Sequence, residues 1–136
     1  LIGVVRFAVG MKLTKPGPRI LELSQEIALA LWRDTLIAGV RDAGPDLSAR
    51  QMAILLTVST TSPPHTVRGL AAGLAISKPA VTRALDRLGT LGYTRRAREE
   101  ADKRSSHVQR TVRGVVFLSE FADQIASAAR KRDRPE

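Results

Sequence analysis

Residues 78–91, KPAVTRALDRLGTL, combine residue types suited to reading the edges of base pairs. On a helix with 100° between residues, Val81, Ala84, Leu85 and Leu88 fall on one face. The opposite face then carries small, polar and basic side chains, namely Pro79, Thr82, Arg83, Asp86 and Thr90. A helix that enters the major groove needs small residues for close approach and donors that reach the bases. The stretch therefore predicts a duplex-reading helix, although an ordinary solvated amphipathic helix has the same periodicity.

Two side chains on that outer face have defined roles if the helix does read a duplex. Arg83 is suited to a bidentate contact with guanine, and Thr82 to a thymine methyl group or a phosphate. Three further residues of the helix, Lys78, Pro79 and Arg87, are predicted to lie in the same interface, together with the residues that cap two of the helices, Thr66 and Ser77.

Positive charge is concentrated around this helix. The chain has 136 residues and carries 22 Lys and Arg against 13 Asp and Glu, a formal net charge of +9. Between residues 68 and 113, eleven basic residues stand against four acidic ones, so this segment holds seven of the nine surplus charges. Such a patch neutralises phosphates. Because only 4% of the residues are aromatic, few rings are present to stack single-stranded bases, which favours a double-stranded partner.

The elements before this helix can be located from their capping residues. Residues 19 to about 40 show a long apolar helical pattern on more than one side, which predicts burial against a second copy and hence a homodimer. Ser48 and Gln51 form a capping box that opens a helix to about Ser59. Thr66 is expected to cap a short helix over 67–74, and Ser77 to cap the helix over 78–91.

The segments after the helix over 78–91 predict a hairpin and a further helix. Residues 94–111 predict a two-stranded hairpin, and Thr111 is expected to cap a final helix. Three helices followed by a hairpin predict a winged helix-turn-helix, mainly α with a small two-stranded β wing. We therefore divide the chain into an N-terminal extension (1–18), a dimerisation helix (19–46), the DNA-binding domain (47–113) and a C-terminal dimerisation helix (114–136).

The sequence resembles the MarR-type transcriptional regulators over roughly residues 47 to 118. The matching stretches are LSARQMAILL, TVRGLAAGLAISKPAVTRALDRLGTLGY and ADKRSSHVQRTVRG. The wing of that family carries an Asp closely followed by an Arg, and later a Thr and a Gly three residues apart, which here are Asp102, Arg104, Thr111 and Gly114. The resemblance implies a homodimeric regulator of transcription that reads a pseudo-palindrome with half-sites about one helical turn apart. Repression is expected, because a dimer that covers a promoter blocks the polymerase without further contacts, although relatives also activate.

The resemblance also gives the acidic residues of the wing a role. Residues two apart on a strand project from the same side, so Asp102 is expected to pre-orient the Arg104 guanidinium for a narrow minor groove. Arg98 and Lys103 are expected to be general phosphate contacts. The alternative is that these charges only solvate an exposed turn, where an ion pair contributes about 0 to 1 kcal/mol.

Two features depart from the family pattern. Members of the family usually have a second long C-terminal helix that completes the dimer, whereas only one helix is predicted after the wing here. In addition, Arg110 stands where the family often has a core leucine. Many relatives bind a small aromatic or lipophilic effector, but only Trp32 and His65 are available to suggest such a site here. Both residues have an ordinary structural interpretation, because a lone Trp usually packs and a lone loop His usually faces solvent.

Several classes of function are disfavoured. The chain has no cysteine and two histidines, and its glycines fit no nucleotide-binding spacing, so we expect neither an enzyme nor a cofactor or metal site. The apolar opening LIGVVRFAVG is interpreted as non-targeting, and no run approaches the roughly 18 residues of a membrane helix, so the expected location is cytoplasmic. The alternatives left open are a winged helix that docks on an acidic protein and a non-specific architectural DNA-binding protein.

Overall fold

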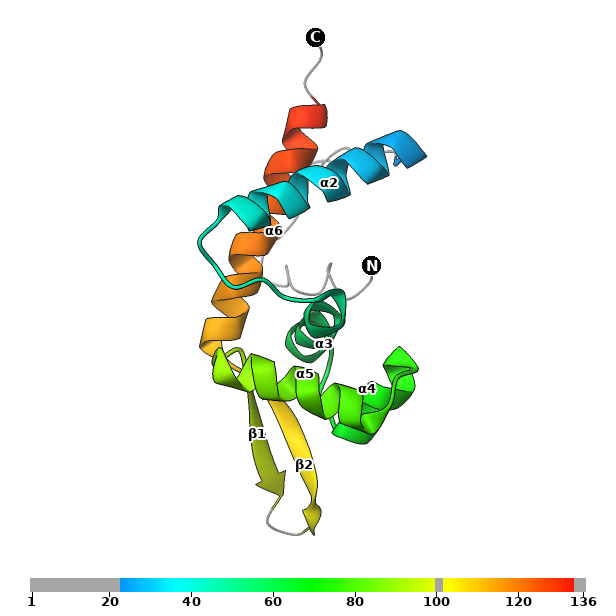
Figure 1. Cartoon of the computed structure of the whole chain (residues 1–136), viewed down its shortest axis with the longest axis vertical. Helices are drawn as coiled ribbons and strands as arrows, with labels where there is room; N and C mark the ends of the chain where they lie inside the picture. The colour runs from blue at the N-terminus through cyan, green and yellow to red at the C-terminus, as the bar shows by residue number, and fades with distance from the viewer. Residues whose placement is uncertain (1–22, 100–101, 134–136) are drawn as a thin grey trace, which may run out of the picture. The chain divides into compact units, whose positions relative to one another are not determined.

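The computed structural model describes residues 23–99 and 102–133, and within the wing it leaves the side chains of residues 98–99 and 102–106 undescribed. The predicted N-terminal extension, residues 1–18, lies outside the described residues. In chain order the described elements are α2 (Gln25–Arg41), α3 (Ala49–Thr60), α4 (Val67–Leu74), α5 (Lys78–Thr90), β1 (Thr94–Glu99), β2 (Asp102–Arg110) and α6 (Val112–Arg132) (Figure 1). This is the predicted mainly α fold with a two-stranded wing.

The chain divides into two compact units. One consists of residues 47–118 and contains α3, α4, α5, the hairpin and the first two turns of α6. We call it the reading head. The other combines α2 with the rest of α6.

The core of the reading head is built where its three helices meet the hairpin. Ile54, Leu55 and Val58 of α3 are buried against α5 residues Val81, Leu85 and Leu88 in one cluster. The same cluster contains Leu70 from α4, Tyr93 just before β1, Val108 from β2, and Leu118 from α6. Burying a Val, Leu or Ile side chain stabilises a fold by about 1.5–3 kcal/mol. The cluster therefore supplies enough apolar contact to fix these elements relative to one another.

The hairpin is attached to the helices by backbone hydrogen bonds. β1 and β2 are antiparallel, with Thr94 opposite Arg110 and Arg96 opposite Val108. The Val108 amide also donates to the His65 carbonyl at 2.8 Å, and Thr66 bridges His107. These two contacts join the residues just before α4 to β2 at the base of the wing.

Thr111 and Gly114 connect the end of the wing to α6. The Thr111 hydroxyl donates to the Gly92 carbonyl at 2.7 Å, and Thr111 Oγ1 accepts from the Gly114 amide at 3.0 Å, which is the predicted cap. Gly92 has a φ of 77°, a conformation that favours glycine. At Gly114 a Cβ atom would lie 2.3 Å from the Tyr93 carbonyl oxygen. These two glycines allow α6 to cross the turn after α5 in direct backbone contact.

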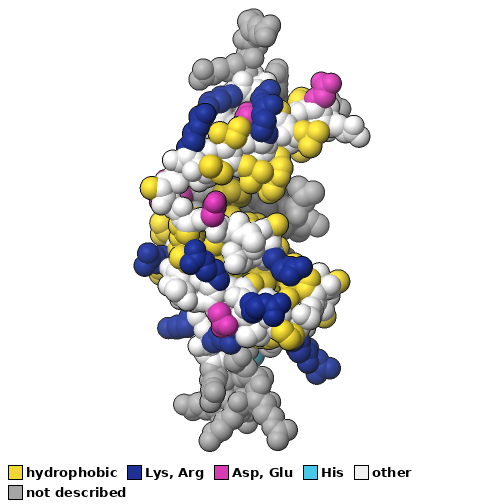
Figure 2. Space-filling view, viewed as in Figure 1, with side chains coloured by type: hydrophobic (Ala, Val, Ile, Leu, Met, Phe, Trp, Pro, Cys, Tyr) yellow, Lys and Arg dark blue, Asp and Glu magenta, His cyan; other side chains and the backbone are white. Residues whose placement is uncertain are grey.

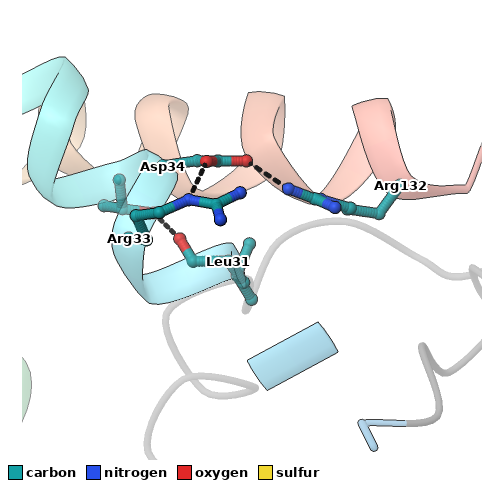
Figure 3. Close-up of polar contacts among 5 residues, drawn as sticks. Leu31, Arg33, Asp34 and Arg132 are labelled. Atoms are coloured by element: carbon teal, nitrogen blue, oxygen red, sulfur yellow. Dashed lines mark hydrogen bonds and ion pairs between the residues drawn. The ribbon is translucent and has the colours of Figure 1, made fainter. Parts of the chain in front are cut away.

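The second unit holds an ion-pair cluster between α2 and α6. Asp34 Oδ2 accepts from Arg132 Nη2 at 2.9 Å, and its Oδ1 accepts from Arg33 Nε at 3.1 Å (Figure 3). Those hydrogen bonds, from Arg132 first and then Arg33, lower the pKa of Asp34 below its ordinary value of 3.8. Thr35 next to it is buried and donates to the Leu31 carbonyl at 2.7 Å.

The start of α2 corrects the predicted helix boundary. A helix from residue 19 was expected, but Ser24 has an extended backbone, and its Oγ accepts from the Ile27 amide as an N-cap. The helix therefore begins at Gln25, while residues 19–22 lie outside the described residues. The serine hydroxyl competes with the helix for a backbone donor, which makes this residue favourable at a boundary and not in a helix interior.

Among the described residues, no helix combines the length and the apolar character that a bilayer-spanning segment requires.

We predict that Gly114→Ala destabilises the protein by about 1–3 kcal/mol, because the added methyl group collides with a backbone carbonyl that cannot rotate away. The matched control is Gly89→Ala in α5, where a Cβ meets nothing within 4 Å. That control should be neutral or stabilising by up to about 1 kcal/mol, since alanine favours a helix. Urea unfolding of both variants measures the difference, and equal free energies of unfolding would contradict the close contact at Gly114.

We also predict that the contribution of Asp34 to stability depends on pH. Its folded-state pKa is depressed, so the stabilisation is fully present above its unfolded pKa of 3.8 and is lost as the pH falls through the folded-state value. Asp34→Asn should therefore lower the melting temperature at pH 7, and this difference from wild type should shrink progressively as the pH falls below 3.8. Asp123→Asn on α6 is the control. A difference between wild type and Asp34→Asn that stayed constant over this range would show that the ion pairs contribute nothing.

Candidate nucleic-acid interface

The orientation of α5 matches the predicted one. Val81 and Leu88 are fully buried, and Ala84 and Leu85 are nearly so. On the outer face Pro79, Arg83, Asp86 and Thr90 are exposed and Thr82 is partly exposed. The residues predicted to read bases therefore point away from the protein core.

The N-termini of α4 and α5 are capped as predicted. Thr66 Oγ1 accepts from the Gly69 amide at 2.9 Å, and Ser77 Oγ accepts from the Ala80 amide at 3.2 Å. Both helices start at the surface, and the exposed Lys78 occupies the first turn of α5. The positive end of a helix dipole and its free amides favour an anion. These two termini are suited to contacting phosphates on either side of a groove.

The turn between α4 and α5 contains a conformation that the sequence did not reveal. Ala75 has a φ of 53°, in the left-handed region where glycine is usual. The Ile76 amide donates to the Ala71 carbonyl at 3.1 Å, which closes the end of α4. A left-handed alanine costs about 1–2 kcal/mol, so packing of the flanking helices must hold this turn in place.

Basic side chains cover this side of the reading head. Figure 2 shows Lys and Arg side chains spread over the surface formed by α4 and α5, with an acidic side chain among them. The exposed basic residues of α4, α5 and the described part of β1 are Arg68, Lys78, Arg83, Arg87, Arg95 and Arg96. These residues come from α4, α5 and β1, and we refer to them together as the positively charged surface.

The hairpin base contributes a contact that sequence reasoning missed. Arg96 Nη2 in β1 donates to Asp86 Oδ1 at 3.2 Å and lies 3.3 Å from the Thr82 carbonyl oxygen. One arginine therefore joins the wing to the outer face of α5 at two points a helical turn apart. The sequence offered one sign of this contact: Asp86 is an acidic residue on the outer face of α5, whose other charged side chains are basic.

Two neighbouring arginines have structural partners as well. Arg95 Nη2 donates to Gln109 Oε1 at 2.8 Å, directly across the hairpin. Arg110 is exposed, and its Nη1 lies 3.5 Å from the Ser59 carbonyl oxygen. Its charge therefore lies outside the core.

The predicted residues at the tip of the wing cannot be placed at the level of side chains. Arg98, Asp102, Lys103 and Arg104 have side chains outside the described residues, so the expected Asp102–Arg104 pair and the phosphate contacts of Arg98 and Lys103 remain predictions. Their backbone lies in the distal part of the hairpin, around a break in register between Arg98 and Glu99.

The two residues considered for an effector lie in different units. Trp32 on α2 is 56% exposed and is therefore not buried in a core. His65 borders a cavity of about 310 Å³ next to α4, which Pro64, Leu70 and Leu74 also line. The His65 Nε2 atom lies 3.2 Å from the Thr61 carbonyl oxygen, a contact that orients the ring. Within the described residues, no three His, Cys, Asp or Glu side chains are grouped to hold a metal ion.

Comparison with known proteins shows what the reading head is similar to. The family model described as MarR family matches residues 46–105, so this part of the chain is similar to that family. The match covers α3, α4, α5, β1 and the start of β2, so it includes every element of the positively charged surface. Among curated proteins, the comparison found no match.

Solved structures of MarR-type proteins share the fold over most of the chain. A transcriptional regulator from Thermotoga maritima aligns with a TM-score of 0.66 and 23% identity, covering 79% of this chain and 72% of that one. A MarR family transcription regulator aligns at 28% identity and a TM-score of 0.56, over 77% of this chain and 65% of its own. A MarR mutant from E. coli, complexed with operator DNA, has a TM-score of 0.58 and 22% identity and covers 79% and 71%.

Proposed function

We propose that this protein is a regulator of transcription that binds double-stranded DNA sequence-specifically as a homodimer. The observation that carries the proposal is the outward face of α5, where Thr82 and Arg83 are accessible beside two capped helix N-termini. Four buried residues on the opposite face prevent the helix from turning this face inward. In the proposed complex α5 lies in the major groove and the wing, residues 94–111, lies at the flanking minor groove.

The division of labour among the predicted site residues follows from their positions. Arg83 and Thr82 contact base edges, because they lie in the middle of the outer face of α5. Lys78 and Arg87 at its two ends, together with the caps Thr66 and Ser77, contact phosphates and set the register. Arg104, held by Asp102, enters the minor groove, while Arg98 and Lys103 contact the backbone nearby. Pro79 lets the first turn approach the DNA closely.

The apolar surface of α2 supports the dimer. Six large apolar side chains of α2 and the residues before it are more than 40% exposed, namely Leu23, Leu29, Trp32, Leu36, Ile37 and Val40. A soluble chain rarely leaves such a contiguous set open to water, so a second copy is the proposed cover. Two reading heads related by a two-fold axis would then read a pseudo-palindrome.

Repression is the proposed sign of control, because a dimer that covers a promoter blocks the polymerase without further contacts. The E. coli MarR mutant among the similar structures is bound to operator DNA, which supports the use of this fold on a duplex. We propose no enzymatic activity. An effector of small aromatic or lipophilic character stays a prediction.

Selection from a random duplex pool tests the proposal. The wild-type protein should enrich a two-fold symmetric motif with half-sites about one turn of DNA apart. On the selected duplex, Arg83→Ala should weaken binding by about 1–3 kcal/mol and relax the base preference at one position of each half-site. Arg130→Ala on α6 is the matched control, and it should leave both quantities unchanged.

Two outcomes would contradict the proposal. Enrichment of no sequence, with tight binding to any duplex, would indicate an architectural protein. Absence of duplex binding at low salt would indicate a winged helix that docks on an acidic protein.

A further inference from the structure

The outer face of α5 contains an acidic residue that a DNA-binding surface should avoid. The Asp86 side chain is 67% exposed and lies one helical turn after Thr82 on the face proposed to enter the groove. An exposed carboxylate there repels phosphates and raises the cost of binding every duplex. We therefore expect a contact of Asp86 that offsets this loss of affinity.

Asp86 has a specific partner in the wing. Arg96 extends from β1 and places one nitrogen, Nη2, 3.2 Å from Asp86 Oδ1 and 3.3 Å from the Thr82 carbonyl oxygen. The Arg96 side chain is 38% exposed, so it lies at the surface of the reading head and not in its core. A surface ion pair alone contributes little, but the backbone carbonyl supplies a second acceptor at a fixed place on α5.

We propose that Asp86 is a specificity-determining residue that withholds the Arg96 guanidinium from DNA phosphates and fixes the direction of the wing relative to α5. This inference rests on the proposed function. Contacts to phosphates strengthen binding to all sequences, whereas base contacts distinguish them. An arginine tied to Asp86 adds nothing to non-specific binding. When the wing is fixed relative to α5, it reaches the flanking minor groove only if α5 is aligned with its half-site in the major groove.

Release of Arg96 should have the opposite effect on the two kinds of complex. On random duplex the protein has no fixed register, so a free guanidinium can find a phosphate and the affinity rises. On the selected operator the base contacts hold the helix in place, so the freed arginine gains less and the loosened wing loses contacts. The ratio of operator affinity to random-duplex affinity therefore falls.

The test is the salt dependence of binding by the full chain to the selected operator and to a random duplex of the same length. Each phosphate neutralised contributes about −0.9 to the slope of log K against log salt concentration. Asp86→Ala should steepen the slope on random duplex by about 0.9 per reading head, raise that affinity, and lower the operator-to-random ratio. Asp123→Ala removes the same charge from a helix of the other unit and should change neither slope nor ratio.

Two further variants identify the cation responsible. Arg96→Gln alone should leave the wild-type slope unchanged, since this residue contacts no phosphate in the wild-type complex. The double variant Asp86→Ala with Arg96→Gln should return the slope to the wild-type value. A double variant that keeps the steeper slope would mean that loss of the Asp86 charge, and not release of Arg96, is the cause.

Other results overturn the proposal in distinct ways. If Arg96→Gln reduces the slope by about 0.9 per reading head, Arg96 is an ordinary phosphate contact. If Asp86→Ala lowers both affinities equally with no change in slope, the pair only supports the fold, and thermal melting of the variant reports the same loss. Should the wild-type protein prefer no sequence, the proposed function fails, while the slopes on random duplex still decide whether Asp86 restrains Arg96. Should it bind no duplex at all, both proposals fail.

Discussion

The arrangement of this protein depends on one packing constraint, which is the burial of one face of α5. Val81, Leu85 and Leu88 pack against α3 in the core cluster, so rotation of the helix about its axis would expose two leucines and a valine to water. At about 1.5–3 kcal/mol for each side chain, that rotation is unfavourable by several kcal/mol. The helix is thereby fixed with Thr82 and Arg83 outward. Every proposed base contact relies on this orientation, because a reading helix has to present the same side chains to every duplex it meets.

The remaining contacts in the reading head place the wing with respect to that helix. Thr111 joins the start of α6 to the Gly92 carbonyl, and the absence of a side chain at Gly114 lets α6 meet the Tyr93 backbone. The Val108 amide joins β2 to His65, the residue before the N-cap of α4, by a backbone hydrogen bond. Arg96 adds a link on the outer surface, from β1 to Asp86. A surface that has to fit two grooves at once benefits from such links, since flexibility between its parts would let it fit many sequences equally well.

The elements of the reading head could be predicted from the sequence because local chemistry determines them. The apolar period of 78–91 predicted which face of α5 is buried, and Ser48, Thr66, Ser77 and Thr111 predicted where helices begin. The Arg96–Asp86 contact was not predictable, since it joins residues ten apart whose proximity depends on how the hairpin leaves α5. The start of α2 was misplaced for a different reason: apolar periodicity continues before Ser24, and only the cap geometry marks the boundary. The roles of Arg83 and Arg104 depend on a partner molecule, so neither the sequence nor the structure of this chain alone determines them.

The measurement that tests the central claim most directly is dimethyl sulfate footprinting of the selected operator with the wild-type protein. This reagent methylates guanine N7 in the major groove, the atom that a bidentate arginine covers together with O6. If the outer face of α5 reads bases, guanine N7 should be protected at the centre of each half-site, in two patches about one helical turn apart. A bound complex in which every guanine N7 in the half-sites remains reactive would contradict the account, because α5 would then not occupy the major groove.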